Sequence, residues 1–267
     1  MKENKAAREM ITSAANPAIR RIRLLARKAK QRREEGVFLV EGPRMAGEIP
    51  EERLEGAWCS ESFAADERYA ALRERLAPQV VSDALFKELS ETTTPQGILA
   101  LVRMTDWKRE DLIREGRPVL LLETLQDPGN LGTIFRTGEG AGIGGILMDS
   151  TTVDPGNPKV VRSTMGSMLR VPYVISQDLG ADIAWLKAQG YTVFAAHLEG
   201  QLSYTEADLK KPAAFLIGNE GNGLTPETAA LADEKILIPM EGRVESLNAA
   251  IAATLLVYEA FRQRRDT

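Results

Sequence analysis

The sequence predicts an α/β protein of two domains, in which a small mixed domain precedes a larger one built on a parallel sheet. A chain of 267 residues is long enough to form two hydrophobic cores. In the second half, continuous apolar segments alternate with helical ones, which is typical of parallel strands covered by helices on both faces. Between the halves lies a polar stretch, residues 105–117, which we interpret as a linker.

The first domain is expected to span residues 1–104. Asn16 and Pro17 are a cap and a first-turn proline, and apolar residues recur after them at helical spacing, so a helix should begin there. Strands and helices then alternate. We expect strands at 37–42, 56–63, from 79, and at 97–104, with helices at 43–50, at 66–78 and up to residue 90.

The second domain is expected to span residues 118–267. It opens with a strongly apolar strand at 118–125, followed by a helix over 131–141. A long apolar helix should begin near residue 246, and its apolar run, residues 249–261, is too short to cross a bilayer. The remaining strands are expected at 144–148, 171–176, 191–197, 213–218 and 235–240.

The net charge of −4 is distributed unevenly along the chain. Residues 1–35 carry eleven Lys and Arg against four Asp and Glu, a net +7, which leaves −11 for the rest. A basic segment on an acidic protein is a pattern that polyanions select, although a solvated helix face would look the same. The residues we expect to contact RNA are Arg20, Arg21, Arg23, Arg27, Lys28, Arg32 and Arg33.

The single cysteine and the single histidine exclude two kinds of site. Cys59 can form no disulfide within the chain, and with His197 as the one histidine no zinc site of paired ligands is expected. The N-terminus lacks the apolar stretch of a signal peptide. We therefore expect a cytoplasmic protein with neither a metal nor a membrane partner.

A G-x-G-x-x-G pattern at Gly140, Gly142 and Gly145 is not interpreted as a dinucleotide fingerprint. Such a fingerprint follows a strand and begins a helix, so that the helix N-terminus meets the pyrophosphate. Here the glycines follow a predicted helix and precede a predicted strand. This reversed order argues against a nucleotide-dependent oxidoreductase.

Three other blocks carry candidate polar residues. In the first, Asn130 follows a strand end and would cap the next helix, and Arg136 lies about one and a half turns further on, where a surface ion pair is the alternative. In the second, the glycine-rich loop 218–223 surrounds Glu220 between a strand and a helix start. In the third, Ser246 and Asn248 precede the long helix, where they would act either in a site or only as caps.

Together these blocks, NLGTIFRTGEGAG, LIGNEGNGL and ILIPMEGRVESLNAAIAATLLVYEA, resemble the signature of the SpoU/TrmH family (SPOUT superfamily) of RNA ribose 2′-O-methyltransferases. Their order and spacing agree across residues 118–264. The basic first domain is similar to the ribosomal-protein-like RNA-binding domain that many members carry. The resemblance implies a trefoil knot in the C-terminal domain, S-adenosylmethionine as cofactor, and a homodimer through the C-terminal helix.

The resemblance also assigns site residues. Gly218, Ile238 and Leu247 fall where backbone contacts hold the cofactor in the family. An arginine guanidinium stays protonated and is a poor free base, so Arg136 is better interpreted as a clamp for phosphate and ribose. The positions of the catalytic site fall on Asn130, Arg136, Glu220, Ser246 and Asn248.

The two-domain layout looks more like family members that act on 23S ribosomal RNA than like the compact transfer-RNA enzymes. Ribose methylation of ribosomal RNA is therefore the expected function. Two alternatives remain at this point: a transfer-RNA 2′-O-methyltransferase, and a non-catalytic RNA-binding or ribosome-assembly factor on the same fold. The intact set of candidate polar residues argues against the second alternative.

Overall fold

The computed structural model describes residues 9–114, 116–243 and 246–265. They form two compact units: one contains the described residues up to Thr105 with Gly156–Arg162, and the other contains Asp106–Pro155 and the described residues from Ser163 onward. The predicted α/β class with a parallel sheet is confirmed. Each unit has its own sheet.

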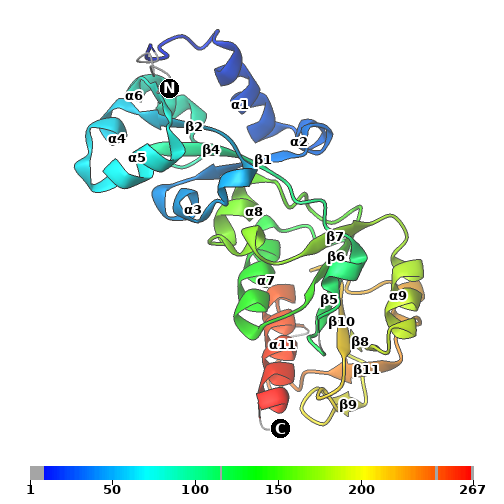
Figure 1. Cartoon of the computed structure of the whole chain (residues 1–267). Helices are drawn as coiled ribbons and strands as arrows, with labels where there is room; N and C mark the ends of the chain where they lie inside the picture. The colour runs from blue at the N-terminus through cyan, green and yellow to red at the C-terminus, as the bar shows by residue number, and fades with distance from the viewer. Residues whose placement is uncertain (1–8, 115, 244–245, 266–267) are drawn as a thin grey trace. The chain divides into compact units, whose positions relative to one another are not determined.

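The first unit is a four-stranded mixed sheet with short helices around it (Figure 1). The strand order is β1-β4-β2-β3; β4 runs antiparallel to both β1 and β2, and β3 runs parallel to β2. Its core packs α1 and α6 on the sheet through side chains such as Ile19, Leu25 and Phe86. The elements are α1 (Pro17–Arg27), α2 (Ala29–Glu35), β1 (Val37–Glu41), α3 (Pro43–Glu48), η1 (Glu51–Arg53), β2 (Leu54–Ser60), α4 (Glu61–Ala65), η2 (Glu67–Tyr69), α5 (Ala70–Leu76), β3 (Gln79–Val81), α6 (Asp83–Leu89) and β4 (Ile98–Arg103).

The second unit is a seven-stranded sheet in the order β7-β6-β5-β10-β8-β11-β9, and every strand pair in it is parallel. One helix of this part of the chain, α8 (Pro158–Ser163), is grouped almost entirely with the first unit. The other elements from residue 106 onward belong to the second unit. They are η3 (Arg109–Leu112), β5 (Val119–Leu122), α7 (Pro128–Ala141), β6 (Gly145–Asp149), η4 (Ser167–Leu169), β7 (Tyr173–Ser176), α9 (Leu179–Ala188), β8 (Thr192–Ala196), β9 (Leu202–Ser203), β10 (Ala213–Ile217), α10 (Pro226–Ala229), β11 (Glu234–Leu237) and α11 (Ala249–Arg265).

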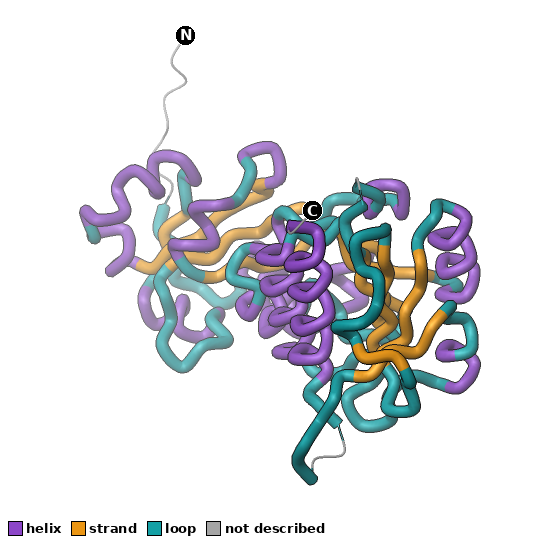
Figure 2. The backbone as a smooth tube through the Cα atoms, turned by 90° about the horizontal axis from the view of Figure 1, so that it is seen from below, coloured by secondary structure: helices purple, strands orange, loops and turns teal. Residues whose placement is uncertain are grey.

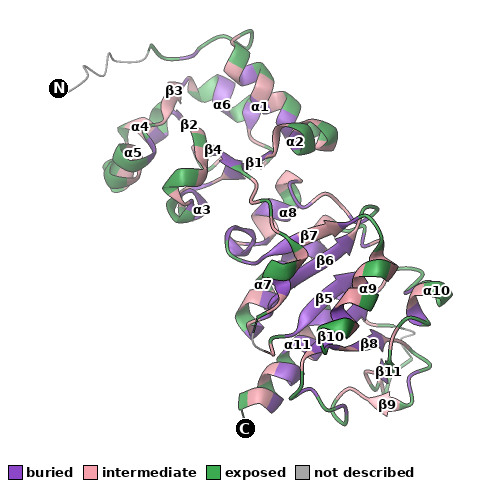
Figure 3. Cartoon of the chain, turned by 45° about the vertical axis from the view of Figure 1, so that its right-hand side comes forward, coloured by how far each residue is buried: buried purple, intermediate pink, exposed green. Residues whose placement is uncertain are grey.

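Helices cover both faces of this sheet. Val119 and Leu121 of β5 pack with Ile183 and Leu186 of α9 in one buried cluster. On the other face α11 lies beside α7 and against β10 (Figures 1 and 2). Because both faces are covered, the central strands are buried along their length, as Figure 3 shows for β5, and this explains their continuous apolar sequences.

The glycines near residue 140 behave as the sequence predicts. The αL residue Gly142, with φ +71°, ends α7, and Gly145 begins β6. No helix N-terminus faces a ligand there. The first residue of α7 was predicted less well, because the helix is capped by Asp127 and not by Asn130. Asp127 Oδ1 accepts a hydrogen bond from the Asn130 N–H at 2.8 Å, which leaves the Asn130 side chain free to point elsewhere.

Candidate active site

The carboxyl ends of β5, β8 and β10 meet at one edge of the parallel sheet, where ligands collect in open α/β sheets. Directly after β10 the chain forms a tight loop over residues 218–223. Asn219 and Gly223 close it with two backbone hydrogen bonds of 3.0 and 2.9 Å, and Gly223 takes φ +69°. The Asn219 side chain accepts from the Gly221 and Asn222 N–H groups and donates to the Thr124 carbonyl at 2.8 Å. The loop is therefore tied to the end of β5.

Gly218 is required by this packing. A Cβ on Gly218 would lie 2.1 Å from the carbonyl carbon of Gly223 and 2.3 Å from the Leu224 nitrogen. Both are backbone atoms, so no side-chain rotation could relieve the contact. Any larger residue at this position would open the loop.

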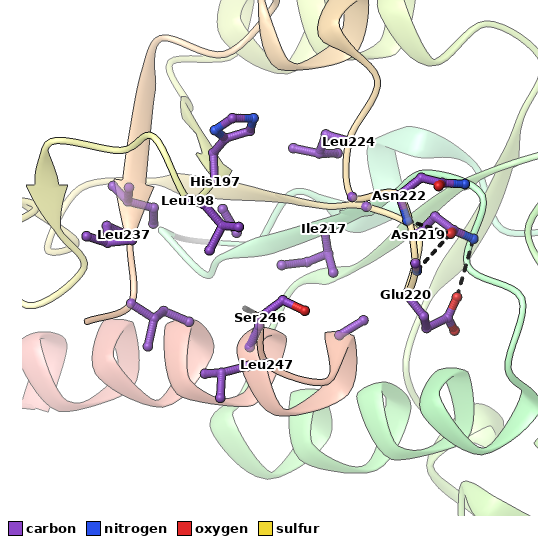
Figure 4. Close-up of a pocket in the computed structure, with 18 of the residues that line it drawn as sticks. His197, Leu198, Ile217, Asn219, Glu220, Asn222, Leu224, Leu237, Ser246 and Leu247 are labelled. Atoms are coloured by element: carbon purple, nitrogen blue, oxygen red, sulfur yellow. Dashed lines mark hydrogen bonds between the residues drawn. The ribbon is translucent and has the colours of Figure 1, made fainter. Parts of the chain in front are cut away.

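Beside the loop lies a cavity of about 310 Å³, a volume typical of small-molecule sites. Its walls combine apolar side chains with the exposed backbone of the glycine loop. Figure 4 shows that the lining comes from separate segments: the end of β8, the end of β10 with its loop, the end of β11, and the residues just before α11. Of the predicted residues, the cavity is lined by Gly218, Glu220, Ile238, Ser246 and Leu247.

A chain of hydrogen bonds joins three of the predicted catalytic residues. The Asn130 Nδ2 donates to Glu220 Oε1 at 3.0 Å, and Asn248 Nδ2 donates to Asn130 Oδ1 at 2.9 Å. Glu220 also accepts from the backbone N–H of Asp127 at 2.9 Å and of Gln126 at 3.1 Å. The carboxylate thus holds the start of α7 against the glycine loop and orients the Asn130 amide.

Asn248 serves both of the roles that its sequence position allowed. Its Oδ1 accepts from the N–H groups of Ala250 and Ile251, and so caps α11, while its Nδ2 reaches Asn130. The cap therefore fixes the amide that extends into the site. The other predicted polar residue of this block, Ser246, is exposed at the cavity wall.

The environment of Glu220 keeps this carboxylate ionised. Partial burial opposes ionisation, but hydrogen bonds from Asn130 and from the backbone of Asp127 and Gln126 outweigh it and hold the pKa below its ordinary value of 4.5. Because the folded-state pKa is lowered, the stability that Glu220 contributes is present above pH 4.5 and is lost as the pH falls through the lowered value.

The contribution of the Glu220 carboxylate to stability can be measured by replacing it. Glu220→Gln replaces an acceptor oxygen that faces backbone donors with an N–H donor, so the variant should melt at a lower temperature than the wild-type protein. The difference in Tm should stay constant from neutral pH to about pH 5 and shrink below that. Thermal unfolding followed by circular dichroism at successive pH values measures it; a difference unchanged to about pH 3 contradicts the assignment.

Arg136 is not brought into this chain of hydrogen bonds. It is exposed on α7, six residues after Asn130, and does not line the cavity. Nor does it pair with any carboxylate among the residues that the structure describes, so the alternative of a surface ion pair finds no support there. Its guanidinium is available to a group arriving from solution.

The predicted RNA-contacting residues belong to the first unit, and they differ in exposure and in ion pairing. Arg20, Arg27, Lys28 and Arg33 are exposed, whereas Arg21 pairs with Glu35 and Glu55, and Arg23 pairs with Glu88. Arg32 is 3% exposed and donates to the Leu25 and Ala26 carbonyls at the end of α1. We therefore assign Arg32 to the support of α1 and leave it out of the RNA surface. The segment 1–8 lies outside the described residues.

Sequence reasoning missed two carboxylates that shape the site. Asp127 caps α7, and the Asp-Pro pair at the start of this helix was the available signal. Glu123, 7% exposed at the end of β5, accepts from the Thr225 N–H and hydroxyl at 2.8 Å each and so anchors the start of α10. Its signal was a carboxylate directly after an apolar strand. His197, which sequence reasoning left open between an exposed loop position and the pocket, lines the cavity.

No described helix has the length and apolar character needed to cross a membrane. Among the same residues, no group of three or more His, Cys, Asp or Glu is arranged to hold a metal ion.

Comparison with known proteins matches both halves of the chain. The model of the SpoU rRNA Methylase family matches residues 117–258, and that of the MRM3-like substrate binding domain matches residues 16–100. A relative from Bacillus subtilis, named 23S rRNA (guanosine(2553)-2′-O)-methyltransferase RlmP, is 33% identical over 94% of this chain and 98% of its own length.

Solved structures agree over nearly the whole chain. The AdoMet-bound rRNA methyltransferase from Sinorhizobium meliloti is 32% identical, with a TM-score of 0.83, covering 95% of this chain and 97% of that one. The SpoU methyltransferase AviRb from Streptomyces viridochromogenes in complex with AdoMet is 28% identical, with a TM-score of 0.84, covering 94% and 98%. The predicted enzyme class, an RNA ribose methyltransferase, and the predicted cofactor, S-adenosylmethionine, are confirmed. The chain belongs to the SpoU rRNA methylase family.

Proposed function

We propose that this protein methylates a ribose 2′-hydroxyl in 23S ribosomal RNA. The observation that carries the proposal is the hydrogen-bonded chain of Glu220, Asn130 and Asn248 beside the cavity of the glycine loop. The name of the Bacillus relative, which matches the chain at nearly full length, supports ribosomal RNA as the substrate. Ribosomal RNA as substrate would also place the protein in the cytoplasm.

The residues around the cavity fit S-adenosylmethionine. The backbone of Gly218, Ile238 and Leu247 would hold it, because the missing Cβ at Gly218 exposes main-chain groups and the apolar wall suits an adenine ring. When bound, the cofactor supplies an electrophilic methyl group on a sulfonium. The volume of about 310 Å³ is sufficient for a ligand of this class.

The polar residues would orient the ribose. One N–H of the Asn130 amide is committed to Glu220, and its oxygen accepts from Asn248, so its second N–H has a fixed direction in which to meet the substrate. Ser246, exposed at the wall, adds a hydroxyl. Glu220 acts as the residue that positions Asn130, and the hydrogen bonds that it accepts from Asn130, Asp127 and Gln126 make it a poor proton acceptor.

Arg136 would clamp the RNA phosphate and stabilise the alkoxide that forms on the ribose oxygen. A guanidinium is a poor proton acceptor, so the proton passes to the substrate's phosphate or to water. Holding the hydroxyl in line behind the methyl carbon is then the main contribution of the site.

The finer features of the family complete the proposal. The second unit would contain a trefoil knot, and two copies would associate through α11. The exposed apolar side chains of Ile251 and Tyr258 on that helix support the homodimer. RNA would bind the first unit at its exposed basic residues, which are Arg20, Arg27, Lys28 and Arg33. Contacts to phosphates would provide the affinity, and contacts to 2′-hydroxyls would distinguish RNA from DNA.

The test uses isotopically labelled S-adenosylmethionine, unmodified ribosomal RNA, nuclease digestion and mass spectrometry of the nucleosides. We expect a labelled 2′-O-methylnucleoside, formed about 100-fold more slowly by Arg136→Ala because the phosphate clamp is lost. Arg114→Ala, an exposed arginine before the opposite end of β5, is the matched control and should keep the wild-type rate. Label in transfer RNA alone, or no label from protein that still binds the cofactor, would overturn the proposal.

A further inference from the structure

The first unit contains a cavity of its own, with a volume of about 440 Å³. It is formed where β2 ends, by the residues around α4 and η2, by α6, and by the loop that leads into β4. This volume lies within the roughly 300–1,000 Å³ of small-molecule sites. The cavity lies wholly within the first unit and shares no residue with the cavity beside the glycine loop.

Aromatic side chains form part of its wall. The rings of Phe63 and Tyr69 are stacked, with centroids 4.4 Å apart and planes 9° from parallel, and the Arg68 guanidinium lies over the Tyr69 ring at 5.5 Å. The neighbouring backbone makes room for this pair, since a Cβ on Gly97 would lie 2.9 Å from Phe63. Phe63 is buried and covers one face of Tyr69, so the surface open to a ligand is the exposed Arg68 guanidinium over that ring. Unpaired RNA bases stack on arginine planes as well as on aromatic rings.

A fixed carboxylate lies at the same cavity. Asp83 Oδ1 accepts from both the N–H and the hydroxyl of Ser62, each at 3.0 Å. Chiefly because of the bond from the Ser62 N–H, the pKa of Asp83 is lowered, so it stays an acceptor at neutral pH. Asp83 is itself exposed, and the nearby Gln96 side chain is exposed too. A ligand with N–H donors can reach both.

The charges leave one cation available at the rim. Asp66 forms hydrogen bonds to the Arg68 guanidinium through both carboxylate oxygens, so these two charges satisfy each other. Lys87 is exposed on α6 and forms no ion pair with any carboxylate among the described residues. A free lysine beside an aromatic wall and a fixed acceptor fits a phosphate that is attached to a base.

We propose that this cavity holds one unpaired nucleotide of the RNA substrate, with its base on the Arg68 guanidinium plane over Tyr69, its N–H edge on Asp83 and its phosphate on Lys87. Guanine is favoured, because its N1 and N2 present adjacent N–H donors to a carboxylate. The proposal rests on the proposed function, since it takes the RNA substrate from it. It adds a second point of recognition, which would select the RNA by a base other than that of the methylated nucleotide.

The first experiment measures RNA affinity without methyl transfer. Full-length protein is titrated into an unmodified 23S transcript, comparing wild type with Lys87→Gln, Gln96→Ala and the pair of both changes. Both residues are exposed, so the fold should survive these changes, whereas Tyr69→Ala would remove the stack with Phe63. We expect about 10-fold weaker binding for the pair, from one lost phosphate contact and one lost base contact. Lys210→Gln, which removes an exposed lysine of the second unit, is the matched control and should bind as wild type.

The second experiment tests the base. Asp83→Asn can keep an oxygen for Ser62 while it offers an N–H to the ligand in place of an acceptor. The same transcript is crosslinked to the protein with ultraviolet light, and the tryptic peptides are identified by mass spectrometry. A guanosine adduct should appear on the peptide that begins at Tyr69, directly after Arg68. Asp83→Asn should reduce the yield of this adduct several-fold. Adducts confined to residues 16–35, with unchanged affinity in the Lys87 and Gln96 variants, would overturn the proposal.

A titration with free GMP completes the test. Tight binding of GMP, with RNA affinity unaffected by the variants, would assign the cavity to a free nucleotide and contradict its role in RNA binding. Failure of the proposed function is distinguishable, because it appears as absent methyl transfer by wild-type protein. The affinity and crosslink data do not depend on that reaction.

Discussion

Replacing Glu220 with Gln is expected to lower kcat for RNA methylation by about 100-fold, with a smaller change in the dissociation constant for S-adenosylmethionine. The carboxylate accepts from the Asn130 amide and from the Asp127 and Gln126 N–H groups. A glutamine whose oxygen takes the place of Oε1 can still accept from the Asn130 amide and the Asp127 N–H, but it turns its own NH2 toward the Gln126 N–H at the place of Oε2. This clash of donors would loosen the start of α7 from the glycine loop, and Asn130 would lose its fixed orientation.

A double-mutant cycle tests the mechanism of this loss. Asn130→Ala alone should cost about as much as Glu220→Gln, because the carboxylate acts through the amide, and the double variant should be no worse than either single one. Single-turnover rates with the cofactor in excess isolate the chemical step. If the two losses multiply in the double variant, Glu220 acts on the reaction by another route.

Replacing Gly218 with Ala should weaken cofactor binding by about 10- to 100-fold. Overpacking a tight site costs ~1–3 kcal/mol, and each 1.4 kcal/mol corresponds to a factor of ten in affinity. We expect the upper end of this range, because the added Cβ would lie 2.1 Å from one backbone atom and 2.3 Å from another. The loop would have to open to accept it, and the cavity wall would open with it.

Gly221→Ala is the matched control in the same loop. A Cβ at this position would meet Asn219 Oδ1 at 3.5 Å, an ordinary van der Waals contact, so affinity should stay within about twofold of wild type. Isothermal titration calorimetry with S-adenosylmethionine compares the two variants, and circular dichroism checks that both are folded. Equal affinities for the two would show that the close approach at Gly218 does not determine the shape of the cofactor site.

Much of the fold was predictable because its signals are local. The continuous apolar strands at 119–122 and 213–217, separated by helical segments, predicted a covered parallel sheet, and that sheet is present. The glycines near residue 140 were correctly placed at a helix end. The cap of α7 was predicted wrongly, because both Asp127 and Asn130 are good cap residues, and only the position of Pro128 in the first turn separates them.

The sequence by itself determined the family, the order of the elements and the three polar blocks of the site, since each of these depends on neighbours a few residues apart. Only the tertiary structure decided which of these residues meet. Asn130 lies 90 residues from Glu220 and 118 from Asn248, and their contacts depend on the spatial order of the strands, which no periodicity encodes. For the same reason the burial of Arg32 and the aromatic cavity of the first unit could not be predicted. The Arg32 side chain lies beside Gly156, and the cavity joins segments from Ser60 to Gly97, so both depend on packing between parts of the chain that are distant in sequence.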